Sequence, residues 1–159
     1  MRALVPFAAG LVLVAGIIGG GRIVWADAED DLAGHMVGEA VLVAHFVAAA
    51  ERAGMSEDAI RAALKDVVAR SAIDEIWITD ETGRAYLSSE DIEFAFDPDP
   101  ARQPQGSAFW PLLEGAETVV IQEARKREID DQVFKYVGVA GVDRPRIVQV
   151  GVRAEHLPH

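Results

Sequence analysis

The chain from Asp27 onward carries apolar residues at helical intervals. Their spacings are three, four and seven residues, at Leu32, Met36, Val43, Val47 and Ala50. These intervals place the side chains on one face of an α-helix. Gly54 is expected to end this helix, because glycine adopts the left-handed conformation without a steric penalty. The pattern therefore predicts a long amphipathic helix from Asp27 to about Gly54.

A second helix is predicted immediately afterwards. Ser56 is suited to cap its first turn, and Glu57 and Asp58 place negative charge at the positive end of the helix dipole. The apolar positions that follow also have helical spacing, at Ile60, Leu64 and Val67. We expect this helix to end near Arg70.

The spacing of apolar residues then changes to two, which is typical of strands. The sequence "EIWIT" (75–79) alternates, "DETG" (80–83) has the composition of a turn, and "RAYL" (84–87) completes a predicted hairpin. Three further β-rich runs follow, at 117–124, 133–141 and 146–152. The turn "VDRP" (142–145) is expected to join the last two runs into a second hairpin.

The segment between the two hairpins has a different composition. Residues 88–106 are acidic and contain Pro98, Pro100 and Pro104, which prevent a long regular element. "SAFWPLL" (107–113) is expected to form one short helical turn. The whole order, two helices, two strands, an irregular segment and three strands, predicts an α+β fold. It consists of an antiparallel, about five-stranded sheet with both helices packed on one side.

The amino terminus, residues 1–26, is predicted to be a membrane anchor. It is uncharged from Ala3 to Gly21, a run of roughly 19 residues that spans about 28 Å as a helix. Trp25 suits the interface at its outer end. We expect a single transmembrane helix in the inner (cytoplasmic) membrane, with the body in the periplasm or outside the cell. The alternative is a signal peptide cleaved at "ADA" (26–28), which would give a secreted protein.

The charge of the body argues against nucleic acid as a partner. The formal net charge of the chain is −11, from 15 basic and 26 acidic residues. Two basic residues and no acidic residue precede Asp27, so the rest carries 13 basic and 26 acidic residues, a balance of −13. Such a body repels phosphate groups.

Few kinds of chemistry are indicated by the residues. The chain has no cysteine, so disulfides, thiolate metal sites and cysteine nucleophiles are excluded. The four histidines are not arranged as a metal pair, and no catalytic motif is present. We therefore expect no metal, no cofactor and no enzymatic activity, and an exported enzyme ranks last among the readings.

Three stretches carry a resemblance to a known family. They are "IDEIWITDETGRAYL" (73–87), "FWPLL" (109–113) and "FKYVGVAGVDRPRIVQVGV" (134–152), and they follow an apolar N-terminus and a long helix. Together they resemble the single Cache sensor domains, PAS-like extracytoplasmic modules of bacterial chemoreceptors and histidine kinases. The resemblance covers residues 27–153 and leaves 154–159 as a tail.

The resemblance implies a specific architecture and function. One face of a PAS-like sheet would pack on the N-terminal helix, and the other face would enclose a small-molecule pocket beneath the irregular segment. Ligand binding would shift the strands against the helix, for signal transduction or chemotaxis. No second transmembrane span or signalling domain follows Arg153 in this sequence. A separate signalling partner is therefore expected.

Aromatic and polar residues beside the irregular segment are the candidate ligand-binding residues. They are Trp77, Tyr86, Trp110, Gln122, Arg125, Arg127 and Tyr136. Aromatic walls and a few fixed polar groups are typical of metabolite sites. An arginine fork matches the two oxygens of a carboxylate, so an organic acid is one expected ligand. The alternative for the basic residues is surface pairing with nearby acids, at Glu123, Glu128, Asp130 and Asp131.

Two functions from different classes remain open at this point. The first is an extracytoplasmic module that binds a small metabolite. The second is a structural or protein-interaction subunit with a filled core and no ligand. A homodimer through the long helix is a further expectation, although the apolar face that would form it must also cover the sheet.

Overall fold

The computed structural model describes residues 18–157. Its elements along the chain are α1 (Ile18–Arg52), α2 (Glu57–Arg70), β1 (Glu75–Thr79), β2 (Ala85–Ser88), η1 (Gly106–Phe109), α3 (Pro111–Glu114), β3 (Val119–Lys126), β4 (Val133–Ala140), β5 (Ile147–Arg153) and η2 (Ala154–His156). The α+β fold class is confirmed. The tail expected at 154–159 begins with the short 3-10 helix η2.

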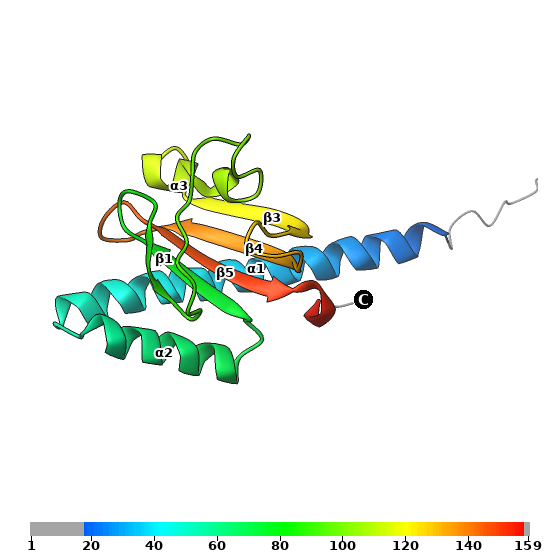
Figure 1. Ribbon diagram of the computed structural model, residues 1–159. Helices are drawn as coiled ribbons and strands as arrows, with labels where there is room; N and C mark the ends of the chain where they lie inside the picture. The colour runs from blue at the N-terminus through cyan, green and yellow to red at the C-terminus, as the bar shows by residue number, and fades with distance from the viewer. Residues whose placement is uncertain (1–17, 158–159) are drawn as a thin grey trace, which may run out of the picture.

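The five strands form one antiparallel sheet in the order β2-β1-β5-β4-β3. The last strand of the chain, β5, therefore lies in the middle, paired with β1 on one side and β4 on the other (Figure 1). The two expected hairpins, β1–β2 and β4–β5, are both present. The edges of the sheet are β2 and β3.

The sheet separates two cores. On the face that we call the helix face, α1 and α2 pack on alternate strand residues, among them Ile76, Val137, Val148 and Val150. Figure 1 shows α1 running behind the strands and continuing past the end of the sheet. On the opposite face, the loop face, residues 89–118 lie over the strands, and we call this segment the cover. Its buried residues Phe96, Phe109 and Leu112 pack with Phe134, Tyr136 and Ile147 of the sheet.

The long helix confirms the predicted amphipathic pattern. Met36, Val43 and Val47 are buried against the sheet, and Leu32 packs at the edge of this core. The helix begins at Ile18 and passes without a break through the boundary expected near residue 26. Residues 1–17 of the expected anchor lie outside the described part of the chain.

A segment of α1 meets the length and composition of a membrane span. This segment is Asp31–Arg52. Core helices pass the same test, and the apolar side of this one is buried on the sheet. Residues 31–52 therefore form the core of the domain. As a whole, the apolar N-terminal helix is compatible with a membrane span or a signal sequence.

The second helix also follows its predicted signals. The Ser56 hydroxyl accepts a hydrogen bond from the backbone N–H of Ala59 at 3.2 Å, as an N-cap does. Gly54 precedes it with φ of 75°, the left-handed conformation expected of a helix stop. Ile60 and Leu64 are buried against the helix face of the sheet.

Candidate functional site

A buried carboxylate lies at the centre of the polar groups on the loop face. Glu75 is the first residue of β1, and only 1% of it is exposed. Its Oε1 accepts hydrogen bonds from Trp77 Nε1, at 2.8 Å, and from the Tyr136 hydroxyl. Its Oε2 pairs with Arg127 Nη1. We call Glu75, Trp77, Arg127, Asp130 and Tyr136 the Glu75 cluster.

The guanidinium of Arg127 is shared between two carboxylates. Its Nε and Nη2 donate to Asp130 at 2.9 and 2.7 Å, while Nη1 contacts Glu75. The ring of Phe134 lies 4.4 Å from the guanidinium carbon, in cation–π geometry. The hydrogen bonds to Asp130 raise the pKa of Arg127, and the same bonds lower the pKa of Asp130. The pairing with Asp130 is one of those expected for a surface arginine, but the pairing with Glu75 makes Arg127 part of a buried cluster.

The Tyr136 phenol completes the cluster. Burial raises the pKa of Tyr136 strongly, and the adjacent Glu75 carboxylate adds to this rise. The phenol therefore stays protonated and donates its hydrogen bond at any physiological pH. Its ring stacks on Phe134 with centroids 5.4 Å apart and an angle of 11°. Gly151 lies opposite Tyr136 in β5, where a Cβ would come within 2.5 Å of the tyrosine ring.

A row of aromatic rings crosses the loop face beside this cluster. The successive centroid distances are 5.6 Å from Trp77 to Phe94, 5.0 Å to Phe96, 6.2 Å to Phe109 and 6.4 Å to Tyr136. The rings come from both the sheet and the cover. We call them the aromatic row.

One buried amide in this region lacks a hydrogen-bond acceptor. Gln149 of β5 is 3% exposed and is paired in register with Trp77 of β1 and Gly138 of β4. Its neighbours Val148 and Val150 belong to the helix-face core, so the Gln149 side chain lies on the loop face. Among the described residues, none accepts a hydrogen bond from its Nε2.

Two of the predicted residues hold the cover instead of facing the cluster. Gln122 of β3 exchanges amide hydrogen bonds with Gln105 at 3.0 and 3.1 Å. Trp110 lies in the cover itself, and its Nε1 donates to Glu114 at 3.1 Å. Glu128 accepts hydrogen bonds from the backbone N–H groups of Gln105 and Gly106. The contacts of Gln122 and Glu128 fasten the cover to β3 and to the segment that follows it.

Tyr86 lies apart from the other candidates, at the helix face. A register shift between Ile78 and Thr79 interrupts the alternation along β1 and β2, and the Tyr86 ring packs against the helix-face core. Its hydroxyl donates to Glu51 at the end of α1 and accepts a hydrogen bond from Arg146 at 2.6 Å. Burial, followed by the bond to Glu51, raises the pKa of Tyr86 to about 12.

Arg146 joins this second cluster to the β4–β5 hairpin. Its guanidinium donates to Glu51 and to Asp143, each at 2.8 Å, and the side chain is almost fully buried. Although burial raises the pKa of Glu51, the bonds from Arg146 and Tyr86 hold it below its ordinary value. The end of α1 is therefore tied to the tip of the last hairpin.

The predicted residue Arg125 and the neighbouring Lys135 differ in exposure. Arg125 lies on β3 with an exposed side chain. Lys135 is buried on the face opposite Tyr136, as the alternation of β4 predicts, with its Nζ 3.7 Å from Glu123. Trp77, Arg127 and Tyr136 are thus the three predicted residues that the fold brings together.

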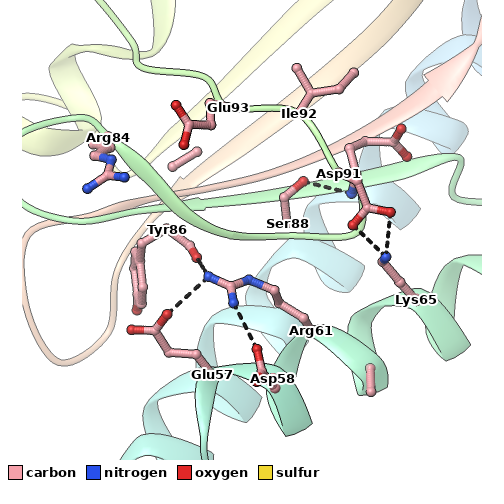
Figure 2. A pocket seen from close by; sticks show the side chains of 13 residues that line it. Glu57, Asp58, Arg61, Lys65, Arg84, Tyr86, Ser88, Asp91, Ile92 and Glu93 are labelled. Atoms are coloured by element: carbon pink, nitrogen blue, oxygen red, sulfur yellow. Dashed lines mark hydrogen bonds and ion pairs between the residues drawn. The ribbon is translucent and has the colours of Figure 1, made fainter.

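An open groove of about 690 Å³ lies elsewhere, between α2, β2 and the start of the cover (Figure 2). Two of its cations, Arg61 and Lys65, are paired with acids of the same groove. Arg61 donates to Glu57 at 3.0 Å and to Asp58 at 3.2 Å, and Lys65 donates to Asp91 at 2.7 Å (Figure 2). Exposed ion pairs of this kind are typical of an ordinary charged surface.

The sequence reasoning missed Glu75 and Gln149. Both occupy alternate positions of otherwise apolar strands, "EIWIT" and "IVQVGV", on the face that also carries Trp77 and Gly151. A polar residue at an inward-facing strand position is a signal that could have identified them.

Comparison with known proteins adds no assignment. No family model matches the chain, and no curated protein matches it. Within residues 18–157 no group of three or more His, Asp or Glu side chains is placed to hold a metal ion. The functional argument therefore rests on the geometry of the loop face.

Proposed function

We propose that the protein is an extracytoplasmic, Cache-like sensor module that binds a small metabolite on the loop face. The observation that carries this proposal is the set of polar groups buried there, including the Gln149 amide without an acceptor. Buried charges and unpartnered amides cost stability in a core, and an apolar core of the same shape avoids that cost. A ligand that accepts a hydrogen bond from Gln149 explains why this amide is buried there.

The architecture supports the proposal. A five-stranded antiparallel sheet has a long N-terminal helix on one face and an irregular cover on the other. This is the arrangement that the resemblance to Cache domains implies. Tethering to the inner membrane by the N-terminal helix, with the body in the periplasm, belongs to the same proposal. Secretion after signal cleavage is the alternative location.

The route from ligand to helix runs through β5. Gln149 lies in this strand. The turn just before the strand is tied to the end of α1 by the ion pair between Arg146 and Glu51. A ligand that binds one arrangement of the sheet more tightly than another shifts the population toward that arrangement. The displacement would reach α1, and from there a separate signalling partner.

A thermal-shift screen of the full chain in mild detergent tests this function. The panel contains carboxylates, amino acids, purines, simple sugars and uncharged ring amides. A ligand present at 100 times its Kd stabilises the folded state by about 2.7 kcal/mol, which gives a dose-dependent rise in Tm. A folded protein that responds to no class would contradict the sensor and favour a subunit that binds other proteins.

A second candidate, association through α1, has its own observation. The apolar side of α1 that was predicted to form a homodimer packs on the sheet instead. Met36, Val43 and Val47 of this side are buried in the helix-face core. On the outward side, Leu42 is 70% exposed, and Glu39, one helical turn before it, is the only Asp, Glu, Lys or Arg between Asp31 and Glu51. We infer that a second copy covers Leu42, because two chains tethered at their N-termini would present this side of α1 in parallel.

Leu42→Glu is the corresponding test. A glutamate at the dimer interface opposes the burial of apolar surface, so the variant is expected to sediment as a monomer where the wild type is a dimer. Val142→Glu, at an exposed apolar position in the β4–β5 turn, is the matched control and leaves the dimer intact. Wild-type protein that is monomeric at 100 μM would contradict the inference.

A further inference from the structure

The chemical class of the ligand can be read from the groups around Gln149. The side chain lies in the central strand, between Trp77 and Gly138, and its Nε2 is a donor without an acceptor among the described residues. A buried N–H group is stable only when an acceptor satisfies it. A ligand that meets this group must therefore offer an acceptor, such as a carbonyl oxygen or an unprotonated ring nitrogen.

The charge of the neighbouring cluster disfavours a carboxylate as that partner. All three nitrogens of the Arg127 guanidinium already contact Glu75 or Asp130. The cluster thus holds two carboxylates and one guanidinium. Arg153 lies nearby, 5.8 Å from the Phe134 ring, and its guanidinium is paired with Asp74 at 3.7 Å. A ligand carboxylate would meet excess negative charge and no uncommitted cation in this cluster.

An ammonium ligand is disfavoured by the donor itself. The Gln149 Nε2 group requires an acceptor, which an ammonium lacks. In addition, Oε1 of Glu75 already accepts two hydrogen bonds, and its Oε2 is paired with Arg127. The polar groups therefore fit an uncharged acceptor better than either ion.

The aromatic row indicates the shape of the molecule. Trp77 is the register neighbour of Gln149, and its ring is followed in the row by those of Phe94, Phe96 and Phe109. Gly138 has no side chain, and the space above it is occupied by Phe109 and Leu112 of the cover. A flat molecule that enters beneath the lifted cover can stack between Trp77 on the sheet and the rings that the cover carries. The contacts of Gln122 and Glu128 with residues 105–106 are those that lifting must break.

We propose that the loop face binds an uncharged, flat ring compound whose carbonyl or ring nitrogen accepts a hydrogen bond from Gln149 Nε2. This inference rests on the proposed sensor function and specifies its ligand class. It also replaces the organic acid expected from the arginines with a neutral aromatic amide or heterocycle.

Matched pairs of probes test the class in the full chain. Each pair differs in one group: benzamide and benzoate, nicotinamide and nicotinate, uracil and its 6-carboxylate. The uncharged member of at least one pair is expected to raise Tm with increasing dose, and its carboxylate to bind at least tenfold more weakly. A response to the carboxylates alone would overturn the ligand class and leave the sensor function standing. If none of the six probes raised Tm, the proposed ligand class would be wrong. If no compound of the broader panel raised Tm, the sensor function would be wrong.

The variant Gln149→Leu tests whether the Gln149 amide binds a ligand or has only a structural role. If the Nε2 donor awaits a ligand, the variant without ligand melts at the same temperature or a few degrees higher, because an unsatisfied donor is gone. The same variant loses at least tenfold in affinity for the uncharged probe. Gln132→Leu, at an exposed glutamine, is the matched control and keeps that affinity. A clear fall in the Tm of Gln149→Leu, or unchanged binding, would overturn the role of Gln149.

Discussion

Arg127→Met is expected to destabilise the protein by about 3–5 kcal/mol, the usual cost of removing one partner of a buried ion pair. Methionine retains an unbranched stem that can lie on the Phe134 ring. It does not neutralise Glu75, whose side chain is buried between Trp77 and Tyr136. Urea denaturation followed by tryptophan fluorescence measures the change in the free energy of unfolding.

Arg125→Met is the matched control for this prediction. Arg125 is two residues earlier on β3 and exposed, so its replacement should change stability by no more than about 0.5 kcal/mol. The double variant Glu75→Gln/Arg127→Met should be more stable than Arg127→Met alone, because it removes the uncompensated charge. Equal effects of the two single arginine variants would show that Glu75 does not depend on Arg127.

Gly138→Ala is expected to cost about 1–3 kcal/mol, as overpacking of a well-filled core does. A Cβ at this position would lie 2.6 Å from Phe109 Cδ1 and 2.9 Å from Leu112 Cδ1. Both side chains belong to the cover and are buried against the sheet, so the cover must shift outward to make room. The variant should therefore unfold at lower temperature, and proteases should cleave its cover faster than that of the wild type.

Gly38→Ala provides a comparison of opposite sign. A Cβ on Gly38 of α1 meets no atom within 4 Å, and alanine favours the helix over glycine by about 0.5–1 kcal/mol. This variant, measured at a concentration that keeps the chain monomeric, should be slightly more stable than the wild type. Unchanged stability and cleavage in Gly138→Ala would mean that the cover does not press on β4.

The local elements of the fold were predictable because their signals are local. Gly54 and Ser56 mark the boundary between the helices, and strand β1 has the predicted bounds of 75–79. Strand β3 begins two residues later than expected, at Val119, since Glu117 and Thr118 remain in the turn. The continuous helix across residue 26 was not predicted, because the boundary was placed where the composition changes, and a change in composition alone does not end a helix.

The candidate site was predictable only in part because its contacts join distant segments. Trp77, Arg127 and Tyr136 were selected for their chemistry, and the fold brings them together through Glu75, which is 52 residues from Arg127. Tyr86 departs from the expected group because a register shift turns it toward α1. No sequence pattern specifies such a shift, and no spacing rule connects Glu75 with a residue in another hairpin.

The position of the last strand at the centre of the sheet constrains how the chain folds. Until residues 147–153 have emerged from the ribosome, β1–β2 and β3–β4 remain separate hairpins with open inner edges. Isolated hairpins are at best marginally stable, and pairing β1 with β5 must close a loop of about 70 residues. The nascent chain therefore stays largely unfolded until residues 147–153 have been synthesised. Such a delay keeps a polypeptide in the extended state that threading through a translocation channel requires.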